Sequence, residues 1–193
     1  MSIIRILPSS LNDIASLEAL VNSAYRGESS RKGWTTEADL LDGIRVDAER
    51  LREVIAGANS EILKATNSQN EIIGCVSLEK QEGRLYLGML TVSPELQNGG
   101  IGKKLLAASE AEAKRMSCSC IYMSVLTQRH ELIAWYERHG YRNTLRKKPF
   151  PMNNPRFGLP KKFLEFFILE KRFPEQRSLC GTLLFLKKAR KTA

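Results

Sequence analysis

The sequence of 193 residues lacks the long apolar segments that membrane proteins and secreted precursors carry. No stretch approaches the ~18 consecutive apolar residues of a transmembrane helix. The opening residues, MSIIRILPSS, lack the longer apolar region of a signal peptide. We therefore expect a cytoplasmic protein without a transmembrane segment. Its length and its hydrophobic content of 42% suit one compact domain with a core of its own.

Histidine and cysteine, the side chains that most often bind transition metals, are scarce. The sequence His130-Glu131 begins like HExxH, but Ala134 stands where the second histidine would be, and the one other histidine is His139. No metal site is expected. The cysteines show no zinc-binding spacing and are interpreted as reduced structural thiols: Cys75, Cys118, Cys120 and Cys180.

Motifs of covalent catalysis and of the common nucleotide-binding folds are also missing. There is no GxSxG elbow and no Cys/His pairing, which argues against an acyl-enzyme route. The sequence contains neither a Walker loop nor the three-glycine Rossmann fingerprint with its following acid. A phosphate-bearing ligand would therefore need a different kind of loop.

What the sequence does contain is a glycine-rich turn between a predicted strand and a predicted helix. Residues 85–92, LYLGMLTV, form an apolar run that is too short for a helix, and a proline follows two residues later. After the turn, QNGGIG at residues 97–102, apolar residues recur at helical spacing. The apolar stripe consists of Ile101, Leu105, Leu106, Ala108, Ala113 and Met116.

A turn of this kind can bind an anion. The first N–H groups of a helix lack intrahelical partners and carry partial positive charge, and glycines let phosphate oxygens approach them. Lys103 and Lys104 lie in the first turn, where a cation opposes the helix dipole unless an anion binds there. The alternative is a hairpin turn at Asn98-Gly99 with solvated lysines. A hairpin needs a second strand, however, and a helix follows.

The stretch resembles the acetyl-CoA signature of the GNAT N-acetyltransferase family, Arg/Gln-x-x-Gly-x-Gly/Ala. Gln97, Gly100 and Gly102 match it, and Val92-Ser93-Pro94 matches the Val-x-Pro that precedes it in the family. The resemblance implies acetyl-CoA as cosubstrate, held by backbone amides of the turn, with its pantetheine arm against the strand end. The implied contacts are Leu90, Thr91, Val92, Gln97, Asn98, Gly99, Gly100, Ile101, Gly102 and Lys103.

Residues 134–141, AWYERHGY, resemble the second signature of the family, which ends in Tyr-Glu-basic-x-Gly-Phe/Tyr. In the family this tyrosine points at the CoA sulfur and acts as general acid, and Tyr136 occupies its position. A phenol of pKa about 10 can return a proton to a thiolate whose conjugate acid titrates near ~8.5. The alternative role of Tyr136 is packing at a helix end. Where the family often has an asparagine that contacts pantetheine, this sequence has Arg129, which would redirect or remove that contact.

The order of the predicted elements matches the acyl-CoA N-acyltransferase fold of this family. We expect an α/β (α+β) domain over residues 1–172, with a mixed, mostly antiparallel sheet of six to seven strands that is flanked by helices and splayed between strands four and five. Strands are expected at residues 3–7, 61–65, 71–78, 85–92, 118–126, 141–146 and 163–170. Helices are expected at residues 11–25, after an N-cap at Thr36, and at residues 47–57, 101–116 and 131–139. Residues 26–34 and the proline-rich residues 147–162 are expected to be irregular loops.

The acceptor is expected to be a small-molecule amine or a peptide. In the family the first loop and second helix line the acceptor pocket, so the resemblance implies Tyr25 and Trp34 as substrate contacts, although both can also be interpreted as ordinary core aromatics. No base for the amine proton is identified, because residues 85–92 contain no carboxylate. The candidates are Glu79, Glu95 and Tyr86.

The net charge of +9 is concentrated towards the C-terminus. Residues 142–162 carry a charge of +7 and residues 171–193 a charge of +6. Solvated loops and a basic extension over residues 173–193 explain this better than nucleic-acid binding, since base-reading motifs are absent. The charge still defines an alternative function, a non-catalytic CoA-responsive binding or regulatory module that contacts a polyanion through its basic C-terminal third. Because the extension could pack on the domain or on a second subunit, both a monomer and a homodimer stay open.

Overall fold

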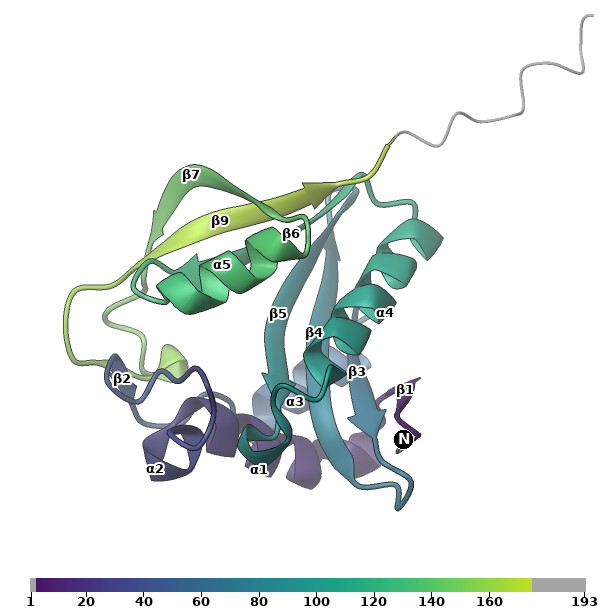
Figure 1. The fold of residues 1–193 in the computed structure, drawn as a ribbon, viewed down its shortest axis with the longest axis horizontal. Coiled ribbons are helices and arrows are strands. Elements are labelled where there is room, and N and C mark those ends of the chain that lie inside the picture. The colour runs from purple at the N-terminus through teal and green to yellow at the C-terminus, as the bar shows by residue number, and fades with distance from the viewer. Residues whose placement is uncertain (1–2, 175–193) are drawn as a thin grey trace, which may run out of the picture.

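A seven-stranded sheet organises residues 3–174, the part of the chain that this computed structural model describes (Figure 1). Its strands are β1 (Arg5–Pro8), β3 (Ser60–Thr66), β4 (Ile72–Gln81), β5 (Arg84–Val92), β6 (Cys120–Leu126), β7 (Arg142–Pro149) and β9 (Glu165–Arg172). They lie in the order β1-β3-β4-β5-β6-β9-β7. Within the described residues each neighbouring pair is antiparallel except β5 and β6. The predicted mixed, mostly antiparallel sheet is confirmed.

Helices cover both faces of this sheet. α4 (Ile101–Arg115) and α5 (His130–Arg138) share one apolar cluster with the sheet and lie in front of it in Figure 1. α1 (Ile14–Tyr25) and α3 (Ala48–Ala56) form a second cluster on the other face. The shorter elements are η1 (Leu11–Asp13), α2 (Gly27–Ser30), β2 (Leu41–Asp42), η2 (Pro94–Leu96), η3 (Pro155–Phe157) and β8 (Leu159–Pro160).

Local sequence explains where these helices start, where they stop and which face they bury. Asp47 caps the N-terminus of α3, because its Oδ1 accepts a hydrogen bond of 2.7 Å from the Arg50 amide. α5 ends where Gly140 adopts a φ of +86°, which glycine reaches without strain. Full burial of a large aliphatic side chain contributes about 1.5–3 kcal/mol. α4 buries much of its predicted stripe, including Ile101, Leu105, Leu106 and Ala113.

The sheet opens between β5 and β6. Within residues 3–174 these two strands pair in parallel only at Leu85 and Tyr86 of β5. Further along β5 the register against β4 shifts beside Met89, which adopts a φ of +52°. A bulge bends the strand that carries it, so β5 turns away from β6 towards its end. The predicted splay between the fourth and fifth strands is confirmed.

Three local expectations are wrong. No helix follows Thr36; its hydroxyl instead accepts a hydrogen bond of 3.1 Å from the Ala38 amide, in a turn that leads into β2. Residues 26–34, expected to be a loop, contain α2. The proline-rich residues 147–162 contain the end of β7, η3 and β8, and β8 pairs with β2. A proline is tolerated in β8 because it lies in a sheet of two edge strands.

Some of the expectations about the cysteines and the C-terminal extension concern residues outside the described range. Cys75, Cys118 and Cys120 are buried and free. Cys180 lies outside the described residues, as does the expected extension from residue 175 onwards. None of the helices within residues 3–174 combines the length and the apolar character needed to cross a bilayer.

Tyr141 provides a test of the packing between α5 and the sheet. Its hydroxyl is buried without a hydrogen-bond partner among the described residues. An unpaired buried polar group costs about 1–3 kcal/mol, so Tyr141→Phe should raise the free energy of unfolding by about 1 kcal/mol. Urea denaturation of both proteins would measure this. A variant that unfolds at lower urea would show that the hydroxyl has a partner in solution.

Candidate functional site

A cavity of about 320 Å³ lies where β5 ends and α4 begins. α1, the segment after α2, the turn before α4 and α5 complete its walls. Gly99, which the family signature implies as a contact, is not part of its lining. The other implied contacts at this turn do line the cavity: Leu90, Thr91, Val92, Gln97, Asn98, Gly100, Ile101, Gly102 and Lys103.

The glycine turn leaves the start of α4 open to this cavity. Gly100 has a φ of +78°, and no heavy atom lies within 4 Å of where its Cβ would be. A Cβ on Gly102 would meet Trp135 at 3.6 Å, an ordinary contact. The first amides of a helix have no intrahelical partner. The turn therefore presents free N–H donors and the exposed Lys103 to a ligand.

Gln97 connects the glycine turn to the segment that follows α2. Its Oε1 accepts a hydrogen bond of 2.9 Å from the Trp34 amide, and its Nε2 donates to the Val92 carbonyl over 3.3 Å. A Cβ on Gly33 would lie 2.6 Å from Gln97 Oε1. A side chain at residue 33 would therefore displace the end of the Gln97 side chain from this position. The side chain of Gln97 thus positions both walls of the cavity.

Tyr136 lies at the inner end of this cavity. It projects from α5, is 4% exposed and stacks edge-on against Trp135 and Tyr141. Burial is the main cause that raises the pKa of the Tyr136 phenol well above its ordinary value of 10. The phenol is therefore protonated at neutral pH and can act as a proton donor.

A second cavity, of about 310 Å³, lies on the other side of the opening in the sheet. It shares several lining residues with the first cavity: Tyr25, Leu90, Arg129, Leu132 and Tyr136. A third cavity, of about 620 Å³, continues from it along β4, β5 and the start of α3. Two compartments therefore meet at Tyr136.

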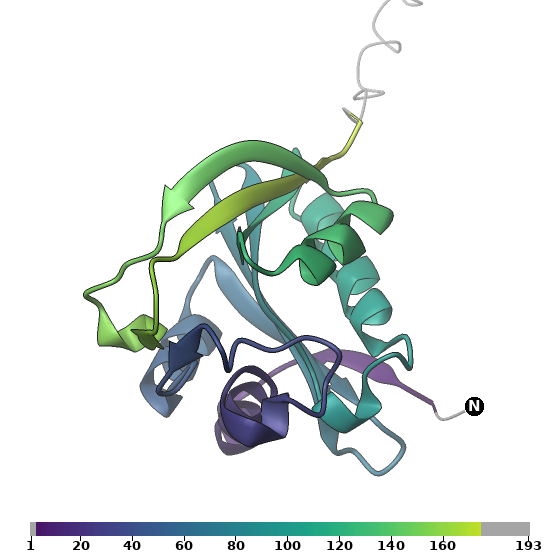
Figure 2. The ribbon, with the colours of Figure 1, turned by 60° about the vertical axis from the view of Figure 1, so that its left-hand side comes forward.

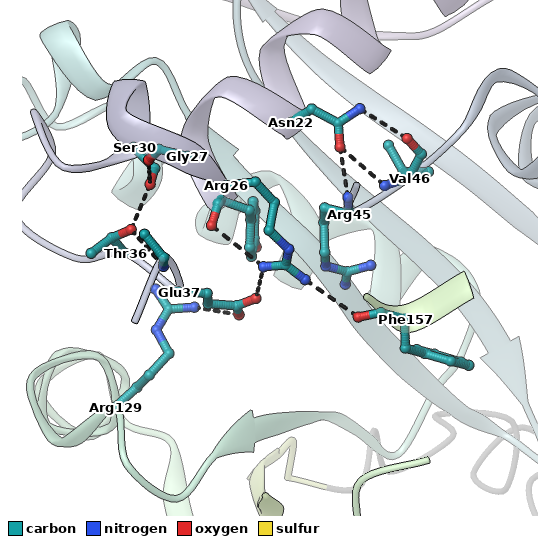
Figure 3. Close-up of polar contacts among 12 residues, drawn as sticks. Asn22, Arg26, Gly27, Ser30, Thr36, Glu37, Arg45, Val46, Arg129 and Phe157 are labelled. Carbon is teal, nitrogen blue, oxygen red and sulfur yellow. Dashed lines mark hydrogen bonds and ion pairs between the residues drawn. The ribbon is translucent and has the colours of Figure 1, made fainter. Parts of the chain in front are cut away.

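A buried ion-pair network forms part of the wall of the second cavity, and one of its members, Arg129, also lines the first (Figure 3). Glu37 binds Arg26 through one oxygen and Arg129 through the other, the latter at 2.8 Å. Each of the three residues is 7% exposed. Burial raises the pKa of the Glu37 carboxyl, but the charges of Arg129, Arg26 and Arg45 outweigh it and hold the pKa below its usual value. Glu37 is therefore ionised at neutral pH.

The residues expected from the family resemblance have specific places here. Tyr25 lines the first two cavities, and its hydroxyl donates to the Leu90 carbonyl over 3.0 Å. Trp34, 39% exposed, lines the first. Arg129 lines both, but its guanidinium is held by Glu37 and by Thr35 Oγ1 at 2.8 Å. It is thus committed to the wall rather than free for a phosphate.

The candidate bases lie in different surroundings. Glu95 is exposed and paired with Lys32 at 2.9 Å, away from the cavity linings. Tyr86 lines the second and third cavities. Glu79 lines the third, so it is the one candidate carboxylate that faces any of the three.

Sequence reasoning missed most of the charged wall of the second cavity. Arg26, Glu37 and Arg45 carry no local signal, since the partners of Glu37 lie 11 and 92 residues away. The cavity face of α5 did have a signal, because its residues recur at helical spacing. That face consists of Leu132, Trp135 and Tyr136, and His139 lines the cavity directly after the helix. Among residues 3–174, no group of His, Cys, Asp and Glu side chains could hold a metal ion.

A mixed sheet that opens beside a glycine turn and the start of a helix defines the acyl-CoA N-acyltransferase fold. The model of the acetyltransferase (GNAT) family matches residues 18–141, and the chain belongs to this family. A curated relative, "Acetyltransferase Atu2258" of Agrobacterium fabrum, is 32% identical over 75 residues. The match covers 39% of this chain and 53% of the relative, so it spans about half of the relative's length.

Solved structures share the fold at low identity. A ribosomal-protein-alanine N-acetyltransferase from Brucella melitensis is 18% identical, with a TM-score of 0.65 over 88% of this chain and 99% of that one. A paia N-acetyltransferase from Thermoplasma acidophilum, in complex with coenzyme A, is 18% identical, with a TM-score of 0.61 over 89% and 99%. At such identities the likeness concerns the fold alone.

The buried ion pairs of Glu37 lead to a prediction about the free energy of unfolding. Glu37→Gln leaves two buried arginines without a counter-charge, which should lower the free energy of unfolding by about 3–5 kcal/mol at pH 7. The folded pKa of Glu37 is lowered, so its stabilising contribution is complete above the ordinary value of 4.5 and is lost as the pH falls through the folded pKa.

The difference between the two proteins should therefore shrink as the pH falls below about 4.5. Urea denaturation from pH 7 down to pH 3 would measure it. Glu28→Gln is the matched control, because Glu28 pairs with Arg31 at the surface and such pairs contribute about 1 kcal/mol or less. A Glu37 variant as stable as this control would show that the buried pair does not hold the wall.

Proposed function

We propose that this protein transfers an acetyl group from acetyl-CoA to the amine of a small molecule or a peptide by direct attack in a ternary complex. The observation that carries the proposal is the meeting of two cavities at Tyr136, across the opening between β5 and β6. One cavity has the glycine turn at its entrance, and the other opens on the opposite side of the sheet. Each can hold one substrate.

The first cavity fits the pantetheine and phosphate parts of acetyl-CoA. Gly100 leaves open space above the first amides of α4, where phosphate oxygens would accept hydrogen bonds. Lys103 adds a positive charge at the same place. β5 has no strand partner beyond Tyr86 on its β6 side within the described residues, so its free backbone groups can pair with the amides of pantetheine. Acetyl-CoA supplies the activated acetyl group.

The reaction joins the amine nitrogen to the acetyl carbon while the bond from that carbon to sulfur breaks. The amine loses one proton, and the departing sulfur needs one. Tyr136 is protonated at neutral pH and lines both cavities, so its hydroxyl can donate to the departing sulfur while it accepts the proton that the amine loses. Neither sequence motif of an acyl-enzyme is present, which favours direct transfer.

No evident base removes the proton of the acceptor amine, but the positive charges around the second cavity make that proton easier to lose. Its one lining carboxylate is Glu37, which is bound to two arginines. Nearby positive charges lower the pKa of an amine, because they disfavour its cationic form. An acceptor amine beside Arg26, Arg45 and Arg129 would therefore lose its proton to water more readily than in bulk solution.

The alternative function, a CoA-responsive module that contacts a polyanion, gains little support from the basic residues 142–162. Four of these side chains lie in ion pairs within the fold: Arg146 with Glu170, Lys147 with Glu165, Arg156 with Glu49 and Lys161 with Asp42. Much of this charge is thus offset by acidic neighbours, and acetyl transfer is the better explanation of the site.

Substitution at the glycine turn tests the acetyl-CoA site. Gly100→Glu would place a bulky carboxylate in the open space above the α4 amides, so CoA binding measured by calorimetry should be lost. Gly83→Glu is the matched control: Gly83 has a φ of +73° and equally open space, but lies in the turn before β5. It carries the same backbone strain, about 1–2 kcal/mol. Equal CoA affinity in the two variants would refute the assignment.

Tyr136→Phe tests the proton donor. The change should lower kcat roughly ten- to a thousandfold and leave the CoA affinity unchanged, because only the hydroxyl is removed. Tyr141→Phe, which removes a buried hydroxyl beside it, should keep kcat at the wild-type value. Thiol release from acetyl-CoA with an amine panel would measure both. A fully active Tyr136→Phe protein would exclude Tyr136 from the chemistry.

The raised pKa of Tyr136 also predicts how kcat depends on pH in alkaline solution. The group stays protonated up to its folded pKa, which lies above 10, so its ionisation should cause no loss of kcat below about pH 10. A profile of kcat against pH would show this. An alkaline decline near pH 8 that disappears in Tyr136→Phe would contradict it.

A further inference from the structure

The second cavity carries more positive than negative charge on its walls. Its cationic side chains are Arg26, Arg45, Arg129 and Lys148, and Glu37 is its one acidic side chain. Glu37 cannot neutralise an incoming cation as well, because both of its oxygens already bind arginines. A ligand in this cavity therefore meets a net positive environment.

Arg45 differs from the two arginines beside it. Arg26 and Arg129 are bound to Glu37, whereas no acidic side chain within residues 3–174 forms an ion pair with Arg45 (Figure 3). Its guanidinium carbon lies 5.3 Å from the centre of the Tyr25 ring. The half-buried side chain lines both the second and the third cavity. An arginine in this position has donors available for a ligand.

The backbone that carries Arg45 is held in place from α1. Asn22 Oδ1 accepts hydrogen bonds from the Arg45 amide at 2.7 Å and from the Val46 amide at 3.2 Å. Asn22 Nδ2 donates to the Val46 carbonyl over 2.9 Å. These bonds fix the segment between β2 and α3, so little ordering of the backbone at Arg45 is needed when a ligand binds.

The remaining walls are mostly apolar. Phe150 and Phe166 pack together 5.5 Å apart, and Phe157 joins them at 6.3 Å from Phe150. Leu87 and Met123 add aliphatic surface. The volume of about 310 Å³ lies at the small end of the usual range of ligand pockets, about 300–1,000 Å³. The cavity thus suits a small molecule with an apolar portion.

These features select against simple amines. An alkylammonium or a polyamine adds positive charge to an already positive cavity, which is unfavourable. A carboxylate on the same molecule offsets that charge, and the planar fork of an arginine matches the two oxygens of a carboxylate.

We propose that the acceptor is an amine that also carries a carboxylate and an apolar side chain, as an apolar amino acid does, and that Arg45 binds the carboxylate. This rests on the proposed acetyl transfer and adds the class of acceptor to it. The amine would then lie towards Tyr136, where the two cavities meet.

Matched pairs of amines test this proposal. L-phenylalanine, L-leucine and L-methionine would each be compared with the corresponding amide, and spermidine would represent polyamines, with thiol release from acetyl-CoA as the readout. The acids should exceed their amides in kcat/KM by roughly ten- to a hundredfold, as expected for a charge-assisted pair. Arg45→Gln should raise KM for the acids by a similar factor and leave the amides unaffected. Arg45→Lys should restore part of the preference.

Arg115→Gln is the matched control, since Arg115 is exposed at the end of α4 and pairs with Glu112. Calorimetry with CoA would run beside every variant and with the wild-type protein. Amides or spermidine used as well as the acids, or a preference unchanged in Arg45→Gln, would overturn the assignment of Arg45. Normal CoA binding with no turnover of any acid would overturn the proposed class of acceptor. Failure of the wild-type protein to bind CoA would instead refute the proposed function.

Discussion

The brevity of the β5 and β6 pairing is the constraint on which the rest of the structure depends. Parallel strands are held by ladder hydrogen bonds, and here the ladder stops after Tyr86. Beyond that point β5 bends at Met89, and its backbone must find other partners. Tyr25 satisfies the Leu90 carbonyl, and the strand end forms the floor of both cavities. If β5 and β6 stayed paired along their whole length, there would be no opening between them and no room for the two cavities.

Buried charge holds the second wall of the opening. Segments 26–42 and α5 lie on different sides of the cavities, and in Figure 2 the dark blue segment after α1 runs beneath α5. Glu37 on this segment bridges Arg26 and Arg129, and Thr35 Oγ1 donates to Glu131 on α5 at 2.7 Å. Removing three charges from water is costly. An apolar contact at this place would avoid that cost, but it would give the cavity no polar wall.

The parts of this site that a sequence predicts are those encoded within a few residues. The glycine turn was predictable because Gly100 and Gly102 stand between an apolar run and a helical stripe. The position of Tyr136 in the cavity lining, though not its role, followed from its resemblance to a family signature. The splay followed from the same resemblance. The ion pairs of Glu37 and the position of Arg45 in the lining of the second cavity were not predictable, because they depend on residues brought together by the fold. The helix expected after Thr36 was wrong for a related reason, since its hydroxyl caps a turn instead.

The short segment from Trp34 to Glu37 has contacts with both compartments. Gln97 holds the Trp34 amide beside the glycine turn, and three residues later Glu37 holds Arg129 beside the second cavity. One short stretch of chain is therefore anchored to both compartments. A ligand that tightened this stretch from one compartment would change the affinity of the other compartment for its own ligand, and linkage would require the reverse effect to be equal.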